Sequence, residues 1–288
     1  MSTKLLGKPV ADEIYKDIDN FINKLQLCPT CNLIYDNLDN GNEYYRKAIV
    51  NNALKHGIKI NSVYIEPSSS REDCIDFIAA LKEKNATANF LLQPCINKNI
   101  EECFTEFVDI KSDIDCITER RLEKSFLYPT YIPCTCKAVL KLLDYYNIFP
   151  EGKTICILGR SRVVGLPLVN ALINRDATVI SCNHYTTKAN MFRHISNSDI
   201  VISCMGNPNV LTEEIIKGNT KQNFTFIDVS TNTVNGVIQG DISDELKEQY
   251  TEYYTSPNNG IGIVTTAILL QEIVDTCIEN MRYMWGNY

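Results

Sequence analysis

The chain has 288 residues, with a hydrophobic fraction of 44%, a charged fraction of 22% and a formal net charge of −7. This length and balance are typical of a soluble globular protein with two domains of ordinary size. The negative charge argues against a general affinity for nucleic acid or anionic membranes, and the absence of a run of about 18 apolar residues argues against a membrane span.

The first half of the chain predicts one helix followed by alternating strands and helices. Apolar residues from Val10 to Leu25 recur at helical spacing behind Pro9, which predicts an amphipathic opening helix. Ser70 and Asp73 form a capping pair for a later helix. The predicted strands are residues 33–35, 63–65 and 90–92. Strands and helices that alternate at this spacing indicate βαβ units and a mostly parallel sheet.

A second alternating series begins near residue 154, after a helix at residues 137–146. Its predicted strands are residues 155–158, 178–181, 200–203 and 224–229. A long helix at about residues 264–281 follows and can return over the first domain. The fold class is therefore α/β with two domains and a cleft between them. The first domain is predicted at residues 1–138, joined by residues 264–288, and a Rossmann-type dinucleotide-binding domain at residues 139–263.

The segment from Gly159 to Gly165 is a candidate phosphate-binding turn. It directly follows the strand at residues 155–158, and Pro167 suits the first turn of a helix. A turn of this kind gives a pyrophosphate backbone donors and a positive helix end. The predicted cofactor contacts in it are Gly159, Arg160, Ser161, Arg162, Val164 and Gly165. The spacing is not GxGxxG, so an ordinary βα turn is the alternative.

The second strand of this series ends without a carboxylate. In the NAD-selective pattern an acidic residue at that place binds the ribose hydroxyls. Here the strand runs into Asn183 and His184, and Arg160, His184 and Lys188 can meet a 2′-phosphate. The sequence therefore favours NADP as the cofactor, with NAD possible. The alternative for Arg160 and His184 is simple surface exposure.

The 12 cysteines do not predict disulfides or a metal site. Most lie in apolar strand-like runs, as Cys156 does, where cysteine acts as a small buried hydrophobe. Cys28 and Cys31 form a lone CxxC without a second pair at zinc spacing. The first residues lack the apolar core of a secretory signal, so a cytoplasmic location is expected.

Several motifs, in order, resemble one family. The segment Gly159-Arg-Ser-x-x-Val-Gly165-x-Pro167 resembles the cofactor signature of the methylenetetrahydrofolate dehydrogenase/cyclohydrolases. Further landmarks of that family are matched at residues 133–135, 198–208, 227–229, 240–241 and 259–265. The resemblance implies NADP, a tetrahydrofolate-type substrate and a homodimer formed through the cofactor domains. It places Gly206 beneath the nicotinamide, and it implies substrate contacts at Gly260, Gly262 and Thr265.

The folate-side residues of the family are matched only in part. Tyr45 matches a tyrosine that stacks on the folate, Gln93 matches a glutamine, and Asp115 matches an aspartate that recognises the pterin. The family also places a lysine four residues after the tyrosine, and that position is Ile49 in this chain. Lys47 points about 160° away around the helix and is a poor substitute.

This departure predicts which reaction survives. Removal of hydride from the methylene bridge depends mainly on orientation beside the nicotinamide. Hydrolysis of the methenyl ring needs general acid–base catalysis, typically worth about 10² to 10⁴ in rate. The resemblance therefore implies a dehydrogenase with weak or absent cyclohydrolase activity, in which Tyr45 positions the substrate, Gln93 polarises the folate and Asp115 anchors the pterin. Two alternatives stay open: a bifunctional enzyme with a substitute acid–base group, and a non-catalytic nucleotide-binding protein.

Overall fold

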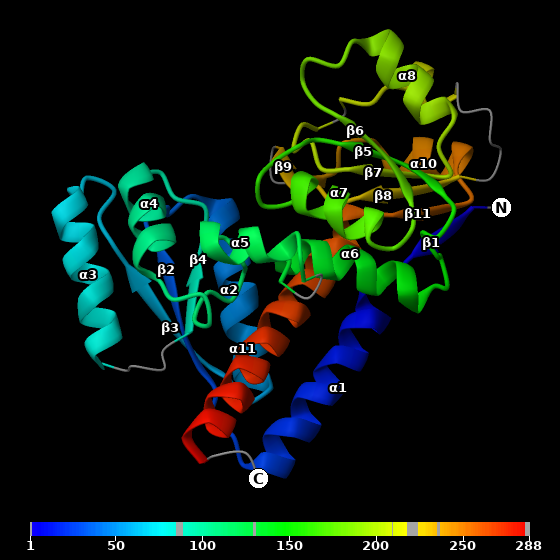
Figure 1. The fold of residues 1–288 in the computed structure, drawn as a ribbon. Helices are drawn as coiled ribbons and strands as arrows, with labels where there is room; N and C mark the ends of the chain where they lie inside the picture. The colour runs from blue at the N-terminus through cyan, green and yellow to red at the C-terminus, as the bar shows by residue number, and fades with distance from the viewer. Residues whose placement is uncertain are drawn as a thin grey trace. The chain divides into compact units, whose positions relative to one another are not determined.

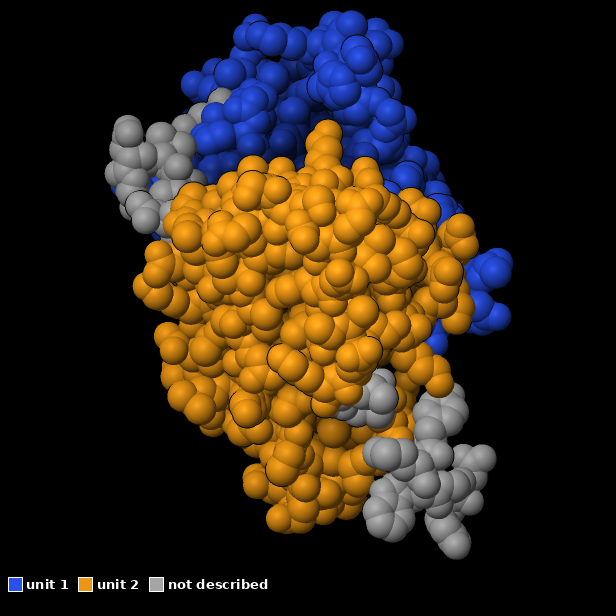
Figure 2. Space-filling model, turned by 90° about the vertical axis from the view of Figure 1, so that its left-hand side faces the viewer, with its two compact units in different colours: residues 1–11, 125–265 blue, residues 12–124, 266–288 orange. Residues whose placement is uncertain are grey.

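The computed structural model describes residues 2–84, 89–128, 131–208, 210–217, 224–234 and 237–285. The chain forms two compact units, shown in Figure 1 as a ribbon and in Figure 2 in separate colours. Unit 1 consists of residues 1–11 and 125–265, and unit 2 of residues 12–124 and 266–288. The chain therefore changes unit three times, each time inside a helix: in α1 (Gly7–Leu25), at the end of α5 (Glu119–Ser125) and in α11 (Ile261–Trp285).

The predicted domains, residues 1–138 with 264–288 and residues 139–263, stay a prediction about which part binds which ligand. Compactness alone does not show ligand binding. In the structure the first passage out of unit 1 lies within the opening helix, and residues 125–138 belong to unit 1.

Unit 1 is built on a six-stranded parallel sheet of order β1-β11-β8-β7-β5-β6. Its strands are β1 (Thr3–Leu5), β5 (Thr154–Leu158), β6 (Thr178–Cys182), β7 (Ile200–Ser203), β8 (Thr225–Asp228) and β11 (Tyr253–Thr255). From β5 the chain moves outward to β6 and then returns to the other side of β5 as β7. This reversal makes a topological switch point at the carboxyl ends of β5 and β7, the place where open α/β sheets bind ligands.

Helices pack around this sheet, and its central strands are accordingly apolar. They are α6 (Cys134–Tyr145), α7 (Gly165–Ile173), α8 (Lys188–Ser196), α9 (Glu213–Lys217) and α10 (Asp244–Tyr250), with a 3-10 turn at Pro257–Asn259. Every residue of β7 and β8 is buried. A short antiparallel pair, β9 (Asn232–Val234) and β10 (Val237–Gln239), was not predicted from the sequence.

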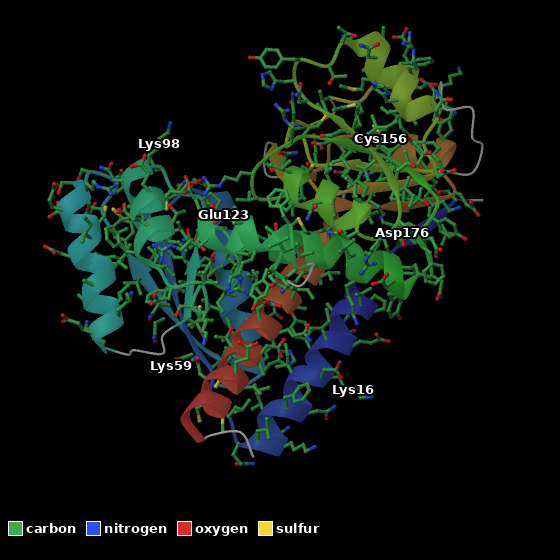
Figure 3. The ribbon with its side chains drawn as sticks, in the orientation of Figure 1. Lys16, Lys59, Lys98, Glu123, Cys156 and Asp176 are labelled. Carbon is green, nitrogen blue, oxygen red and sulfur yellow. The ribbon has the colours of Figure 1, made fainter. Side chains whose placement is uncertain are left out.

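The burial of Cys156 confirms that this cysteine acts as a small hydrophobic residue of a buried strand. It lies among the strands of unit 1 with no exposed surface, and its sulfur is 3.9 Å from that of Cys182 (Figure 3). All 12 cysteines lie within the described residues, and all are free thiols.

Unit 2 contains a three-stranded parallel sheet of order β3-β2-β4. Its strands are β2 (Thr30–Tyr35), β3 (Lys59–Tyr64) and β4 (Asn89–Leu92), and its helices include α2 (Asn40–Lys55), α3 (Arg71–Lys84), α4 (Lys98–Phe107) and α5 (Glu119–Ser125). Apolar residues of α3 and α4 pack with Ile34, Phe90 and Leu92 on one face, and Figure 1 shows α2 on the other side of the sheet. The predicted capping pair is confirmed, since the N–H of Ser70 donates to Asp73 and the N–H of Asp73 donates to Ser70 Oγ.

α11 is the one described helix that is long and apolar enough to cross a membrane, over Ile261–Met281. The sequence predicts no such segment, because residues such as Gln271 and Glu272 interrupt the apolar run. In the structure 61% of its most apolar window is buried inside the protein. Core helices of soluble proteins meet the same criterion of length and composition, and the burial of α11 is of that kind.

Candidate functional site

The turn from Gly159 to Gly165 joins β5 to α7 at the switch point. Gly159 has a φ of 107°, and a Cβ on it would lie 2.5 Å from the carbonyl oxygen of Cys204. A Cβ on Gly165 would overlap the carbonyl oxygen of Gly159. Glycine avoids both overlaps, so the two glycines allow the turn to pack against the end of β7 and the start of α7.

The Ser161 hydroxyl accepts hydrogen bonds at the start of α7, and two backbone N–H groups beside it remain without an acceptor. Its hydroxyl accepts hydrogen bonds from the N–H groups of Val164 at 3.2 Å and Gly165 at 3.4 Å. The N–H groups of Arg160 and Ser161 have no acceptor among the described residues. Backbone donors near a helix N-terminus are suited to an anion, so this part of the turn fits a phosphate group.

A cavity of about 330 Å³ lies at this turn within unit 1. Its walls come from the carboxyl ends of β5, β6 and β7, as a switch point requires. Of the predicted cofactor residues, four line the cavity: Gly159, Arg160, Ser161 and His184. Arg162, Val164 and Gly165 belong to the same turn, and Gly206 follows the lining residue Met205 directly. The structure thus brings the predicted cofactor contacts together at one place.

The end of β6 carries no carboxylate in the structure either. Asn183 follows the strand and forms a local turn, in which its side chain accepts from the N–H of Tyr185 at 2.9 Å. The rings of His184 and Tyr185 lie 3.9 Å apart, and His184 is exposed. Arg160, also exposed, lies on the same cavity. A guanidinium and an imidazole without an opposing carboxylate fit a 2′-phosphorylated dinucleotide better than an unphosphorylated one.

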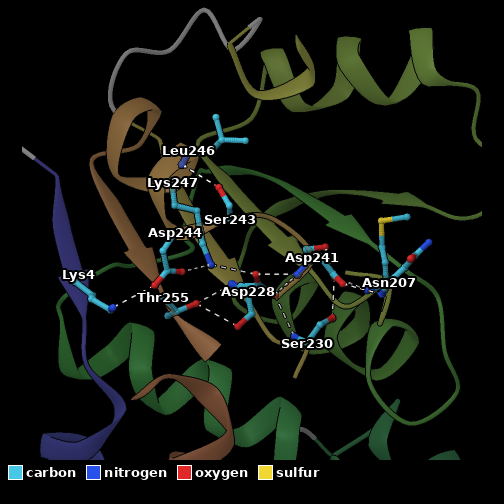
Figure 4. A network of polar contacts seen from close by, with 12 residues as sticks. Lys4, Asn207, Asp228, Ser230, Asp241, Ser243, Asp244, Leu246, Lys247 and Thr255 are labelled. Carbon is cyan, nitrogen blue, oxygen red and sulfur yellow. Dashed lines mark hydrogen bonds and ion pairs between the residues drawn. The ribbon is translucent and has the colours of Figure 1, made fainter. Parts of the chain in front are cut away.

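The loop after β7 is held by one buried carboxylate, that of Asp241 (Figure 4). Its oxygens accept four hydrogen bonds, from the hydroxyls of Ser203 (2.6 Å) and Ser230 (2.7 Å) and from the N–H groups of Met205 (2.9 Å) and Asn207 (2.9 Å). The N–H of Gly206 donates in turn to Ser230 Oγ at 3.0 Å. Three consecutive N–H groups are therefore fixed, which preorganises the loop that contributes to the cavity wall.

A buried ion pair inside unit 1 lies next to Asp241. The sequence analysis did not identify this ion pair as a functional feature. Lys247 on α10 and Asp228 at the end of β8 have fully buried side chains, with Nζ and Oδ2 3.1 Å apart. Lys247 Nζ also lies 2.9 Å from Asp244 Oδ1. Asp228 accepts from the N–H of Asp241 at 3.1 Å. Burial raises the pKa of Asp228 to about 6, although Lys247 acts in the opposite direction.

On the folate side, α2 carries Tyr45 and Ile49 in unit 2. Tyr45 is half-buried, whereas Ile49 has no exposed surface. Lys47 points to solvent, as its helical position predicts, and its Nζ lies 2.5 Å from Glu43 Oε1. The position that the family resemblance assigns to a lysine is therefore an apolar core position, and Lys47 does not replace that lysine.

Gln93 follows β4 directly and is almost fully buried, with 2% of its surface exposed. Its Oε1 accepts from Arg46 Nη1 at 3.0 Å, and its Nε2 donates to the carbonyl of Asn42 at 3.2 Å. Sequence analysis did not single out Arg46. The available signal was its place on the helix, next to Tyr45 and three residues before Ile49.

Asp115 lies in a turn that follows a bridge to β4. Asp113 forms a parallel bridge with Phe90, and Ile114 and Asp115 form a turn directly after it. Asp115 is half-buried. The loop itself is capped by Asp113, whose carboxylate accepts from the N–H groups of Ile117 (3.2 Å) and Thr118 (2.8 Å).

The remaining predicted substrate residues surround the beginning of α11, in unit 1. Gly260 is buried, and a Cβ on Gly7 would overlap its carbonyl oxygen, so α1 begins directly against this turn. Gly262 is exposed. Thr265 is nearly buried, and its hydroxyl donates to the carbonyl of Ile261 at 3.0 Å. Their contact with a substrate stays a prediction.

Comparison with known proteins agrees with this geometry. The model of the tetrahydrofolate dehydrogenase/cyclohydrolase NAD(P)-binding domain matches residues 133–281. The chain belongs to the tetrahydrofolate dehydrogenase/cyclohydrolase family. Within that family, the bifunctional protein FolD of Clostridium beijerinckii is 31% identical over 281 residues, which cover 95% of this chain and 97% of that relative. The predicted family resemblance is thereby confirmed.

Solved structures share the fold over nearly the whole chain. The methylenetetrahydrofolate dehydrogenase-cyclohydrolase of Trypanosoma brucei, complexed with NADP and an inhibitor, has a TM-score of 0.90 at 24% identity, covering 98% of this chain and 99% of that one. The bifunctional enzyme of Thermoplasma acidophilum has a TM-score of 0.85 at 25% identity, covering 97% and 100%. The α/β fold with a Rossmann-type domain is therefore confirmed for this family member.

Proposed function

We propose that this chain oxidises 5,10-methylenetetrahydrofolate to 5,10-methenyltetrahydrofolate with NADP in one-carbon metabolism, and that its cyclohydrolase activity is weak or lost. Family membership supports the substrate and the cofactor. One observation carries the second part: Ile49, which is fully buried and apolar, occupies the position that the family resemblance assigns to a lysine. An isoleucine side chain cannot transfer a proton, so the acid–base work of ring hydrolysis lacks its usual group.

The cofactor half of the site is proposed in unit 1. NADP, when bound, supplies the acceptor for the hydride. Gly159 to Gly165 would hold the pyrophosphate, with Arg160 and His184 at the 2′-phosphate and Gly206 on the nicotinamide side. The chain contributes backbone donors and a preorganised loop there, which favour binding in one orientation.

The folate half is proposed to use Tyr45, Gln93 and Asp115, all in unit 2. Gly260, Gly262 and Thr265 stay substrate contacts implied by the family resemblance. Tyr45 is half-buried, so part of its surface is exposed. Gln93 follows β4 directly, and Asp115 comes two residues after Asp113, which bridges Phe90 of that strand. These placements support substrate positioning, which is the larger requirement of hydride transfer.

A homodimer formed through the cofactor domains and a cytoplasmic location are further parts of this proposal. The family resemblance supports the dimer, and 12 free thiols are in keeping with a reducing compartment. Light scattering coupled to size-exclusion chromatography tests the dimer. The measured molar mass of a dimer would be twice the 32.7 kDa of one chain.

The test of the activity is an assay of the purified protein with methylenetetrahydrofolate and NADP, repeated with NAD. Reduced cofactor and methenyl product are followed separately in acid-quenched samples, beside a control without enzyme. We expect methenyl product to accumulate in step with reduced NADP. Loss of methenyl product faster than in the control would show a surviving cyclohydrolase. No reduction of either cofactor would leave a non-catalytic nucleotide-binding protein.

A further inference from the structure

A buried arginine stands among the folate-side residues of unit 2. Arg46 lies on α2, next to Tyr45 and three residues before Ile49, and only 8% of its surface is exposed. Its guanidinium carbon lies 3.8 Å from the ring centroid of Tyr35, so the cation stacks on an aromatic face. The folate side of this chain therefore contains a fixed positive charge one turn away from the place where the family resemblance expects a lysine.

Arg46 determines how the Gln93 carboxamide is oriented. An arginine can only donate hydrogen bonds, so the Gln93 atom 3.0 Å from Arg46 Nη1 must be the carbonyl oxygen. A backbone carbonyl can only accept, so the Gln93 atom facing Asn42 must be the amide nitrogen. The two contacts agree on one orientation. They leave one amide hydrogen and one oxygen lone pair of Gln93 for a ligand.

The surroundings of Arg46 do not explain its burial by stability. Within the described part of the chain no carboxylate forms an ion pair with Arg46, and Glu43 on the same helix pairs with Lys47 instead. With 8% of its surface exposed, Arg46 has lost much of its hydration, and an apolar side chain of similar size is often neutral or stabilising at such a place. A costly charge held beside Gln93 is the arrangement expected of a functional group.

We infer that Arg46 is a positioning residue of the folate reaction, which acts by fixing and polarising the Gln93 carboxamide through a permanently charged donor. This inference rests on the proposed function. Because an arginine stays protonated at all physiological pH values, Arg46 can orient and polarise but cannot relay a proton. It therefore supports hydride transfer without restoring the acid–base step of ring hydrolysis.

A double-mutant cycle on the dehydrogenase reaction tests this inference. We expect Arg46→Met to lower kcat by about tenfold to a hundredfold, the range for losing a hydrogen bond to a charged group, with the KM for NADP unchanged. If Arg46 acts through Gln93, the double variant Arg46→Met/Gln93→Leu will be no slower than Gln93→Leu alone. Arg46→Lys keeps a charged donor and is expected to recover part of the loss.

The control is Lys47→Met, which removes the neighbouring exposed lysine and is expected to leave kcat unchanged. Circular dichroism verifies that Arg46→Met is folded, because the variant leaves the buried Gln93 Oε1 without its donor. Additive losses in the cycle, wild-type kcat in Arg46→Met, or no recovery in Arg46→Lys would each overturn the inference. An inactive wild type would instead overturn the proposed function, so the two failures are distinguishable.

Discussion

At the scale of single residues, Ile49 separates the two reactions of this family. Its side chain is fully buried on α2, four residues from the half-buried Tyr45. A lysine at this position would share a helix face with Tyr45, and burial would lower its pKa towards the range of a useful acid–base group. The apolar residue provides packing but no proton transfer.

We therefore predict that Ile49→Lys gains methenyl hydrolysis. The expected gain is about tenfold or more over the wild type, at the lower end of what general acid–base catalysis contributes. The measurement is the decay of methenyltetrahydrofolate with folded protein, verified by circular dichroism. Ile49→Met is the matched control, since it conserves volume without adding a titratable group. A folded Ile49→Lys variant with wild-type hydrolysis would contradict the argument.

Gly159 allows a second prediction at this scale. An alanine there has to adopt a φ of 107° and place its Cβ 2.5 Å from the carbonyl oxygen of Cys204, so the turn must shift. We expect Gly159→Ala to weaken NADP binding by at least tenfold in calorimetry.

Gly152→Ala serves as the control for backbone strain alone. Gly152 also has a positive φ, 69°, but a Cβ on it would meet nothing within 4 Å, and the residue does not line the cavity. We expect Gly152→Ala to cost about 1 kcal/mol of stability with NADP affinity unchanged. Equal losses of affinity in both variants would show that general strain, rather than the turn, is responsible.

The sequence alone located the residues whose chemistry is local. Gly159, Ser161 and Gly165 could be found because a strand, a turn and a helix start follow one another in the chain. Arg46 and Lys247 could not be assigned roles in this way. Their partners, Gln93 and Asp228, lie 47 and 19 residues away, and a surface position is the usual expectation for a charged residue.

At the scale of elements, apolar periodicity predicted the long helices and the central strands well. The predicted strand at residues 200–203 coincides with β7, and the capping pair at Ser70 marks the start of α3. The sequence analysis did not predict β1 and β11, which lie at one side of the unit 1 sheet. Each has only three residues, and the two strands pair with each other. Short strands carry too few side chains to show a period.

The ion pair between Asp228, at the end of β8, and Lys247, on α10, supports a prediction about stability. Lys247→Met leaves the carboxylate of Asp228 buried without its cation, and removing one partner of a buried pair typically costs about 3 to 5 kcal/mol. We expect a loss of this size in urea unfolding of the variant. The double variant Lys247→Met/Asp228→Asn should recover much of it, because no uncompensated charge remains. A small loss in Lys247→Met alone would mean that the pair is easily hydrated.

At the scale of the whole molecule, Asp228 makes one contribution to the dependence of stability on pH. Its pKa is raised from 3.8 to about 6 in the folded protein, mainly by burial. The folded state therefore binds this proton more tightly than the unfolded state, and its contribution to stability is present below about pH 4 and is lost as pH rises to about 6.

We predict that the free energy of unfolding of the wild type, minus that of Asp228→Asn, falls by roughly 2 kcal/mol between about pH 4.5 and about pH 7. The subtraction removes the effect of the other carboxyl groups, many of which are stabilising at higher pH. Urea titrations at both pH values provide the measurement. A difference that rises with pH would mean that Lys247 outweighs burial and lowers the pKa of Asp228.

The division into units has a consequence for how the chain is made. Unit 2 takes its first segment from Asp12–Lys124 and its last from Thr266–Tyr288, whereas unit 1 needs both Met1–Ala11 and Ser125–Thr265. Domains generally fold as units during translation, in the order in which they leave the ribosome. Here the nascent chain must hold residues 12–124 without their closing helix until the last part of α11 emerges. Chaperones that protect exposed apolar surface during synthesis should therefore associate with this protein until its translation is nearly complete.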